Sequence, residues 1–279
     1  MATLALAEQD QVRRLLELFP VTSLRLTWPG HKGTKAEICA AVAVEGDFEL
    51  ITAFVVHEFN RCKQHVYTFI PGEGVDIADA FPNSDPFATD GDASVLHMAT
   101  VDYLVHIGNP YQAIPVSYLW PIRVAMKKKT TVVSFITLER KPVPFSDRPV
   151  IAAKREIDER DVVSSILSLG CQTADLNKGI KGLWKDDYVD IVRSKFKRAL
   201  STDESTMDDE RGIKQYMPDL YEEMLKVPLM NSLLRIHPKL ESSLSYFQCD
   251  PTSGKIIFTS YTEGLGDSDG IVQAILGKN

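Results

Sequence analysis

The sequence has 279 residues, of which 44% are hydrophobic and 25% are charged, and its formal net charge is −7. These values are typical of a globular protein with one or two domains, and they exclude collagen, coiled coil and global disorder. No apolar run reaches the roughly 18 to 20 residues that cross a bilayer, and the N-terminus lacks the basic start and long apolar core of a signal peptide. We therefore expect a cytoplasmic protein that does not contact a membrane.

The charge is distributed unevenly along the chain. Residues 1–120 carry a net charge of −8, residues 121–200 carry +7 and residues 201–279 carry −6. A basic middle of this kind marks either a surface for an anionic partner or two parts of the protein that attract each other. The four cysteines form no C-x-x-C pair, so neither a zinc ribbon nor a thioredoxin-like site is expected, and we expect no cofactor.

The first 142 residues predict an N-terminal helix followed by an antiparallel sheet. Residues 7–19 place four apolar side chains on one helical stripe, and Pro20 ends the helix. The next stretches alternate apolar and polar residues or are rich in β-branched residues, which is typical of strands in a meander. These predicted strands are residues 23–28, 36–47, 48–59 and 65–70.

The sequence Gly-His-Lys-Gly at 30–33 separates the first two predicted strands, so it most simply turns a hairpin. It does not fit the Walker A pattern, which needs Gly-x-x-x-x-Gly-Lys-Ser/Thr. Its G-x-x-G core does match the loop with which KH domains clamp nucleic-acid backbone. A KH loop lies between two helices, however, whereas here a strand is predicted to precede it.

The rest of the N-terminal part predicts an acidic loop, a helix capped by Asp92 and two strands joined by a turn of three lysines. These elements are residues 71–92, 93–108, 115–126 and 130–140. The three prolines of residues 141–149 indicate a linker. We place a domain boundary there, between an α+β antiparallel-sheet domain (1–142) and a mostly helical domain (150–279).

The C-terminal part predicts helices at 158–170 and 181–200, and then three short helices that begin near Pro218, Pro228 and Pro238. A hairpin with an Asp-Pro-x-x-Gly turn follows at 245–261, and a last helix covers 271–276. The predicted fold class is therefore α+β: an N-terminal helix and an antiparallel β-meander sheet, followed by a mostly helical part with a terminal hairpin.

Acid–base chemistry has one candidate group. Asp102 and His106 are four positions apart on the predicted helix, where a carboxylate would orient the imidazole. With His57 they would form the His/Asp site of a hydrolase or nuclease, with or without a metal ion. His57 and Glu58 are expected on opposite faces of a strand. Asp267 and Asp269 are candidate metal ligands, although the simpler interpretation is that they stabilise a turn and cap the N-terminus of a helix.

The basic middle supports a different function. Its cations lie at a hairpin tip, after the linker and in one helical region: Lys127, Lys128, Lys129, Lys154, Arg155, Lys185, Arg193, Lys195, Lys197 and Arg198. If they converge, they would contact nucleic-acid backbone with a strong salt dependence, and without reading bases because no aromatic residues interleave them. We expect a non-catalytic binding or scaffold protein. The alternatives are an acidic protein partner, self-association, or the enzyme described above.

Overall fold

The computed structural model describes residues 4, 7–80, 84–89, 94–107, 112–127, 129–138, 150–155, 159–197, 202–206 and 212–279. The strand pairs with a defined register, nine in the described residues, are antiparallel, and helices accompany the sheets, which confirms the predicted α+β class. The chain forms two compact units, each assembled from separate segments. The N-terminal unit is Met1–Phe59, Pro71–Lys127 and Phe135–Cys171, and the C-terminal unit is Asn60–Ile70, Lys128–Ser134 and Gln172–Asn279. The predicted linker at 141–149 lies outside the described residues.

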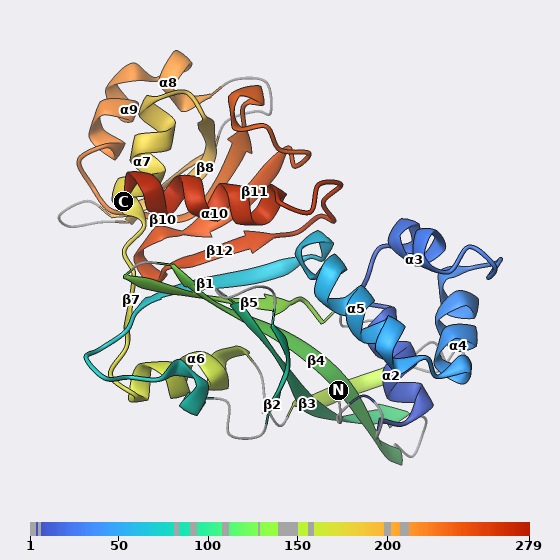
Figure 1. Cartoon of the computed structure of the whole chain (residues 1–279). Coiled ribbons are helices and arrows are strands. Elements are labelled where there is room, and N and C mark those ends of the chain that lie inside the picture. The colour runs from blue at the N-terminus through green and yellow to red at the C-terminus, as the bar shows by residue number, and fades with distance from the viewer. Residues whose placement is uncertain are drawn as a thin grey trace. The chain divides into compact units, whose positions relative to one another are not determined.

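The sheet of the N-terminal unit is organised around one long strand. β3 pairs with β4 along its whole length, while β2 and β6 share its other edge (Figure 1). Its strands are β2 (Ser84–Thr89), β3 (Ser94–Ile107), β4 (Gln112–Lys127) and β6 (Val150–Arg155). Helix α2 packs on β4, where Arg14 donates to the Ser117 carbonyl oxygen at 3.0 Å and its guanidinium lies 5.6 Å from the Tyr118 ring centroid.

Helices make up most of the first 60 residues. They are α2 (Gln9–Leu16), α3 (Val21–Thr27), α4 (Lys35–Glu45) and α5 (Phe48–Glu58), and α6 (Glu159–Ser168) comes later in the same unit. Short 3-10 turns also occur in the chain: η1 (Phe59–Arg61), η2 (Ile77–Ala80), η4 (Pro238–Leu240) and η5 (Pro251–Ser253).

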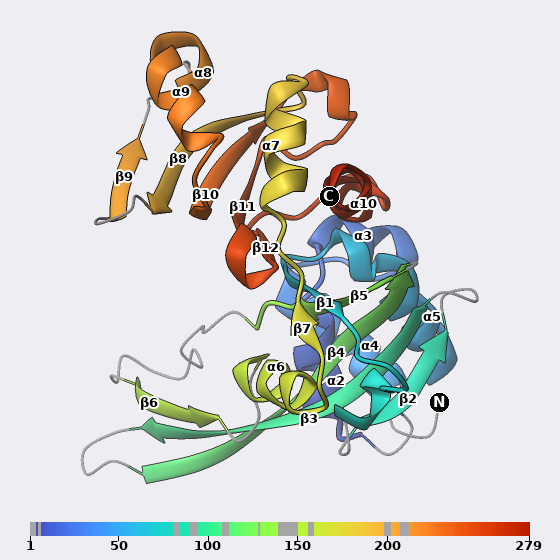
Figure 2. The same ribbon diagram turned by 90° about the vertical axis from the view of Figure 1, so that its left-hand side faces the viewer.

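The sheet of the C-terminal unit has the strand order β5-β1-β12-β11-β10-β8-β9, and β7 pairs with the end of β1. These strands are β5 (Thr130–Ile136), β1 (Gln64–Ile70), β12 (Lys255–Phe258), β11 (Tyr246–Asp250), β10 (Leu229–Ile236), β8 (Val189–Lys197), β9 (Thr202–Thr206) and β7 (Gln172–Thr173). Its helices are α7 (Asn177–Lys185), α8 (Ile213–Tyr216), α9 (Pro218–Met224) and α10 (Asp267–Lys278). Helices α7 and α10 lie against one face of β8, β10, β11 and β12 (Figures 1 and 2).

Three predicted strands are wrong, because residues 23–28, 36–47 and 48–59 form helices α3, α4 and α5. The helices begin with good caps. Thr34 and Glu37 form a capping box at α4, and the Asp47 carboxylate accepts from the backbone N–H of Leu50 at α5. The loop at 30–33 therefore joins two helices, and the predicted hairpin there is wrong.

Other elements were predicted with the wrong type. The predicted helix 93–108 is wrong, because its described residues Ser94–Ile107 form strand β3, and the acidic stretch 71–92 contains η2 and β2. The predicted helix 181–200 ends at Lys185, since Asp187 adopts a left-handed backbone (φ 58°) and the chain continues as β8. Pro218 and Pro238 do start short helical segments, whereas the residues after Pro228 form strand β10.

Three predictions for the later part of the chain are confirmed. β11 and β12 form the terminal hairpin across the Asp-Pro-x-x-Gly turn, in which Gly254 is left-handed (φ 63°). The helix ending near Gly170 and the final helix are also present as α6 and α10. The four cysteines are buried and free.

Candidate anion-binding site

The face of the C-terminal sheet that α7 and α10 leave uncovered carries a cavity of about 350 Å³. Strands β8, β10, β11 and β12 all contribute to it. Its lining consists of three cations, two amides, one carboxylate and three other residues: Arg193, Lys195, Lys255, Asn231, Gln248, Asp250, Ser232, Cys249 and Ile257. Strands far apart in the sequence thus bring their polar side chains to one place.

Strand alternation explains why these polar side chains share a face. Arg193 and Lys195 are two positions apart on β8, so they point to the same side of the sheet. The same spacing relates Gln248 to Asp250 on β11. Phe247, which precedes Gln248 on β11, is buried and by the same alternation lies on the opposite face. The sequence therefore builds an apolar face toward the helices and a polar face toward the cavity.

A β-bulge in β10 completes the cavity wall. The register between β10 and β8 shifts between Met230 and Leu233, and Asn231 has a left-handed backbone with φ 36°. Asparagine tolerates this conformation better than most residues, and bulges redirect side chains near binding sites. The hydroxyls of Ser194 and Ser232 are 2.7 Å apart beside the bulge, which fixes its position.

The cavity has unused hydrogen-bonding capacity. The side chains of Arg193, Asn231 and Gln248 make no hydrogen bond or ion pair with any residue that the structure describes, and Arg193 and Asn231 are exposed. The Lys255 ammonium lies over the Tyr67 ring, 4.9 Å from its centroid. With three cations and one carboxylate, the lining carries a net positive charge, and the Arg193 guanidinium and the two amides offer hydrogen-bond donors to an anion.

The predicted basic residues divide between different places. Only Arg193 and Lys195 line the cavity, and Lys185 is exposed at the end of α7 on the helical side of the sheet. The prediction that these residues share one helical region is wrong, because α7 ends before β8 begins. Lys127 ends β4, Lys129 precedes β5, Lys154 and Arg155 end β6, and Lys197 ends β8. Lys128 and Arg198 lie outside the described residues.

Lys255 is the cation that sequence reasoning missed. It belongs to the terminal hairpin, where it pairs in register with Asp250 across the turn. Because that hairpin is predicted correctly, the alternation of β12 indicates that Lys255 and Ile257 share a face. What the sequence does not show is that β10 and β8 lie beside this hairpin.

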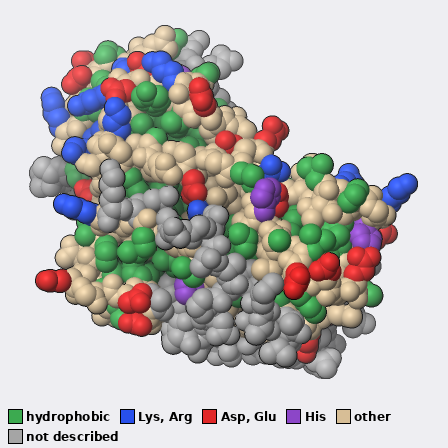
Figure 3. All heavy atoms as spheres, in the orientation of Figure 1, with side chains coloured by type: hydrophobic (Ala, Val, Ile, Leu, Met, Phe, Trp, Pro, Cys, Tyr) green, Lys and Arg blue, Asp and Glu red, His purple; other side chains and the backbone are tan. Residues whose placement is uncertain are grey.

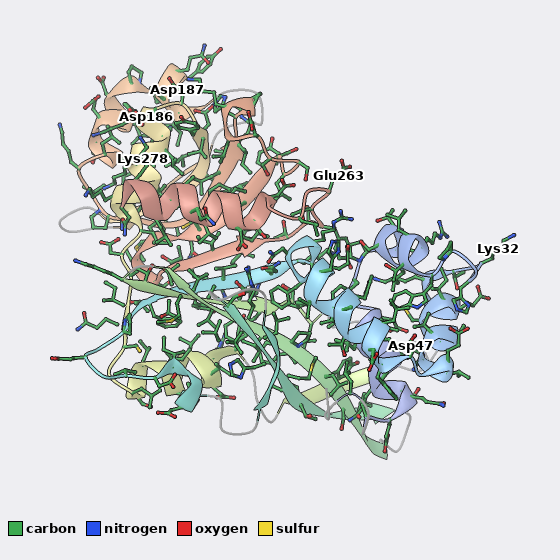
Figure 4. The ribbon with its side chains drawn as sticks, in the orientation of Figure 1. Lys32, Asp47, Asp186, Asp187, Glu263 and Lys278 are labelled. Carbon is green, nitrogen blue, oxygen red and sulfur yellow. The ribbon has the colours of Figure 1, made fainter. Side chains whose placement is uncertain are left out.

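Charges near the α7 side of the unit are used within the fold. Lys278 donates to the Asp186 carboxylate at 2.6 Å, and this hydrogen bond raises the pKa of the lysine (Figure 4). Lys214 donates to Asp187 at 2.5 Å, which lowers the pKa of the carboxyl group. Figure 3, which views α10 from the front, accordingly shows acidic and basic side chains mixed over this unit.

The catalytic candidates are all in the N-terminal unit. His57 is at the end of α5, where its Nδ1 lies 2.8 Å from Oε1 of the buried Glu58. The two residues are thus neighbours, and the prediction that they occupy opposite faces of a strand is wrong. Asp102 and His106 are on strand β3, so their helical i, i+4 pairing does not occur; their side chains are outside the part of the chain described at side-chain level.

The metal-ligand candidates are hydrogen-bonded within the fold. The Asp267 carboxylate accepts from the backbone N–H groups of Ser243 and Gly264, both at 3.2 Å, and from the Ser243 hydroxyl. Asp269 accepts from the Asn60 amide at 3.2 Å. Among the described residues, no group of three or more His, Cys, Asp or Glu side chains is placed to hold a metal ion.

No protein-family model, curated protein or solved structure matches this chain. Within the described ranges, no helix is both long enough and apolar enough to span a bilayer. The fold and the site together define an α+β protein with a cationic cavity on an antiparallel sheet.

Proposed function

We propose that this protein is a non-catalytic binding protein that contacts nucleic-acid backbone through the cavity of its C-terminal unit. The convergence of Arg193, Lys195 and Lys255 on one concave surface is the observation that supports this function. Phosphate groups are recognised by such clusters, since guanidinium and ammonium groups donate charge-assisted hydrogen bonds to their oxygens.

The shape of the site favours a single strand over a duplex. A cavity of about 350 Å³ accommodates a segment of one or two nucleotides, which a flexible single strand can present. No aromatic side chain belongs to the cavity lining that the structure describes, so stacking of bases is not expected there. The cations and amides contact phosphate and sugar, and such contacts are independent of base sequence.

Fluorescence anisotropy with a labelled single-stranded 12-mer at low salt tests this function. The variant R193A/K195A/K255A removes the three cavity cations, and we expect it to bind about 10- to 100-fold more weakly, at about 0.5–1 kcal/mol per lost contact. The matched control K178A/K185A/K239A removes three exposed lysines outside the cavity lining. It should retain most of the affinity. An equal loss in both variants, or no binding by the unmodified protein, would refute the proposal.

A further inference from the structure

The cationic cavity also holds a carboxylate that a simple phosphate site would not contain. Asp250 lies among the cations, opposite Lys255 in the hairpin register. Its Oδ1 accepts from the Thr252 hydroxyl at 2.9 Å, and no described residue donates to its Oδ2. A carboxylate repels a phosphate at this range, so its presence weakens binding of an anion that offers nothing else. A ligand that satisfies both the cations and this carboxylate would carry a hydrogen-bond donor next to its phosphate.

Two amides flank this carboxylate. Gln248 is two positions before Asp250 on β11 and shares its face, and Asn231 extends from the bulge of β10. Neither amide is bonded to a described residue, and each can both donate and accept. A hydroxyl group needs such surroundings, because it donates one hydrogen bond and accepts others. The cavity thus combines donors for phosphate with partners for a neighbouring hydroxyl.

We infer that the cavity recognises the ribose 2′-hydroxyl and so selects single-stranded RNA over DNA. Asp250 accepts the hydrogen bond of the hydroxyl, Gln248 completes its coordination, and the cations hold the adjacent phosphate. The 2′-hydroxyl is the group that distinguishes RNA from DNA at a given site, and every ribonucleotide carries it. This inference rests on the proposed function and adds the class of nucleic acid.

The test compares two oligonucleotides that differ only in the 2′-hydroxyl, a uridine 12-mer and a deoxyuridine 12-mer, by anisotropy with the full chain. We expect the RNA to bind about 10- to 150-fold more tightly, which is the range for a hydrogen bond to a charged group. D250A should reduce this ratio to about one while the affinity for DNA stays the same or rises, since the repulsion is removed. A folding defect would lower both affinities instead.

A matched control separates the carboxylate from the turn that it belongs to. T252V removes the hydroxyl that bonds to Asp250 but leaves the carboxylate in place. It should keep the preference for RNA, and the melting temperature of both variants is measured alongside. Loss of the preference in T252V as well would assign the effect to the turn and overturn the inference.

Two further outcomes are informative. If both 12-mers bind equally and D250A changes both affinities alike, ribose recognition is refuted while the proposed function stands. If neither 12-mer binds, the proposed function itself fails. A deoxycytidine 12-mer carries an exocyclic amino group but no 2′-hydroxyl. If the protein prefers it to the deoxyuridine 12-mer and D250A abolishes that preference, Asp250 contacts the base, and the assignment to the ribose is overturned.

Discussion

The salt dependence of binding gives a quantitative test of the cavity, because the number of cations in it sets the slope. Each phosphate that a cation neutralises on a single strand contributes about −0.7 to the slope of log K against log salt concentration. Three cavity cations predict a slope of about −2.1, so raising salt from about 50 to about 200 mM should weaken binding roughly 20-fold. The variant R193A leaves two cations, and its slope should fall to about −1.4, a loss of roughly sevenfold over the same range.

Anisotropy titrations at four salt concentrations measure these slopes, with the unmodified protein, R193A and K185A in parallel. K185A is the control because Lys185 is exposed at the end of α7, outside the cavity. Its slope should match that of the unmodified protein. A slope that R193A leaves unchanged, or that K185A reduces as much, would show that the counterions are released elsewhere and refute the assignment of the cavity.

Three further predictions concern stability. Gly179 in α7 leaves no space for a side chain, as a Cβ atom would lie 2.3 Å from a carbonyl oxygen of α10, so G179A should cost about 1–3 kcal/mol in urea unfolding. G270A in α10, where no atom lies near the position of a Cβ atom, should stabilise the protein by about 0.5–1 kcal/mol; if G179A and G270A changed the free energy of unfolding equally, the close packing of α7 on α10 would be contradicted. Ser23 donates to the buried carboxylate of Glu58, so S23A should cost about 1–3 kcal/mol; an unchanged unfolding midpoint would refute this role. Burial lowers the pKa of His97 below its ordinary value of 6.5, so its contribution to stability is complete above that pH and is lost as pH falls through the folded-state pKa. The unfolding midpoint should therefore drop less between about pH 7.5 and about pH 5.5 in H97L than in the unmodified protein, and a parallel drop would contradict it.

The sequence predicts the α+β class and the terminal hairpin, but it misassigns elements that are apolar at most positions. Residues 36–47 and 48–59 have apolar residues that satisfy both a twofold and a 3.6-fold period. The strand β3 is buried on both faces over much of its described length, and such a strand resembles a helix in its apolar pattern. The sequence does carry one local signal for α4, since Thr34-Lys-Ala-Glu37 is a capping box, which indicates a helix start.

The site could be predicted only in part, and a wrong element type concealed why its residues converge. On a helix, Arg193 and Lys195 would point about 200° apart, at 100° per residue. On strand β8 they share a face, so the correction from helix to strand brings them together. Lys255 is some sixty positions further along the chain, and its place depends on the order β12-β11-β10-β8. Strand order depends on long-range packing that no local pattern encodes.

The uneven charge of the sequence allowed two interpretations, an open cationic surface or attraction between segments, and the C-terminal unit contains both arrangements. Carboxylates of the basic segment pair with cations of the acidic C-terminal segment: Asp186 with Lys278, Asp187 with Lys214, and Asp190 with Arg235 at 2.9 Å. These pairs hold the connection between α7 and β8 to its surroundings. Arg193 pairs with none of the described carboxylates. The cations available to a ligand are therefore those that do not pair with carboxylates within the fold. The net charge of a sequence segment does not show where these cations lie.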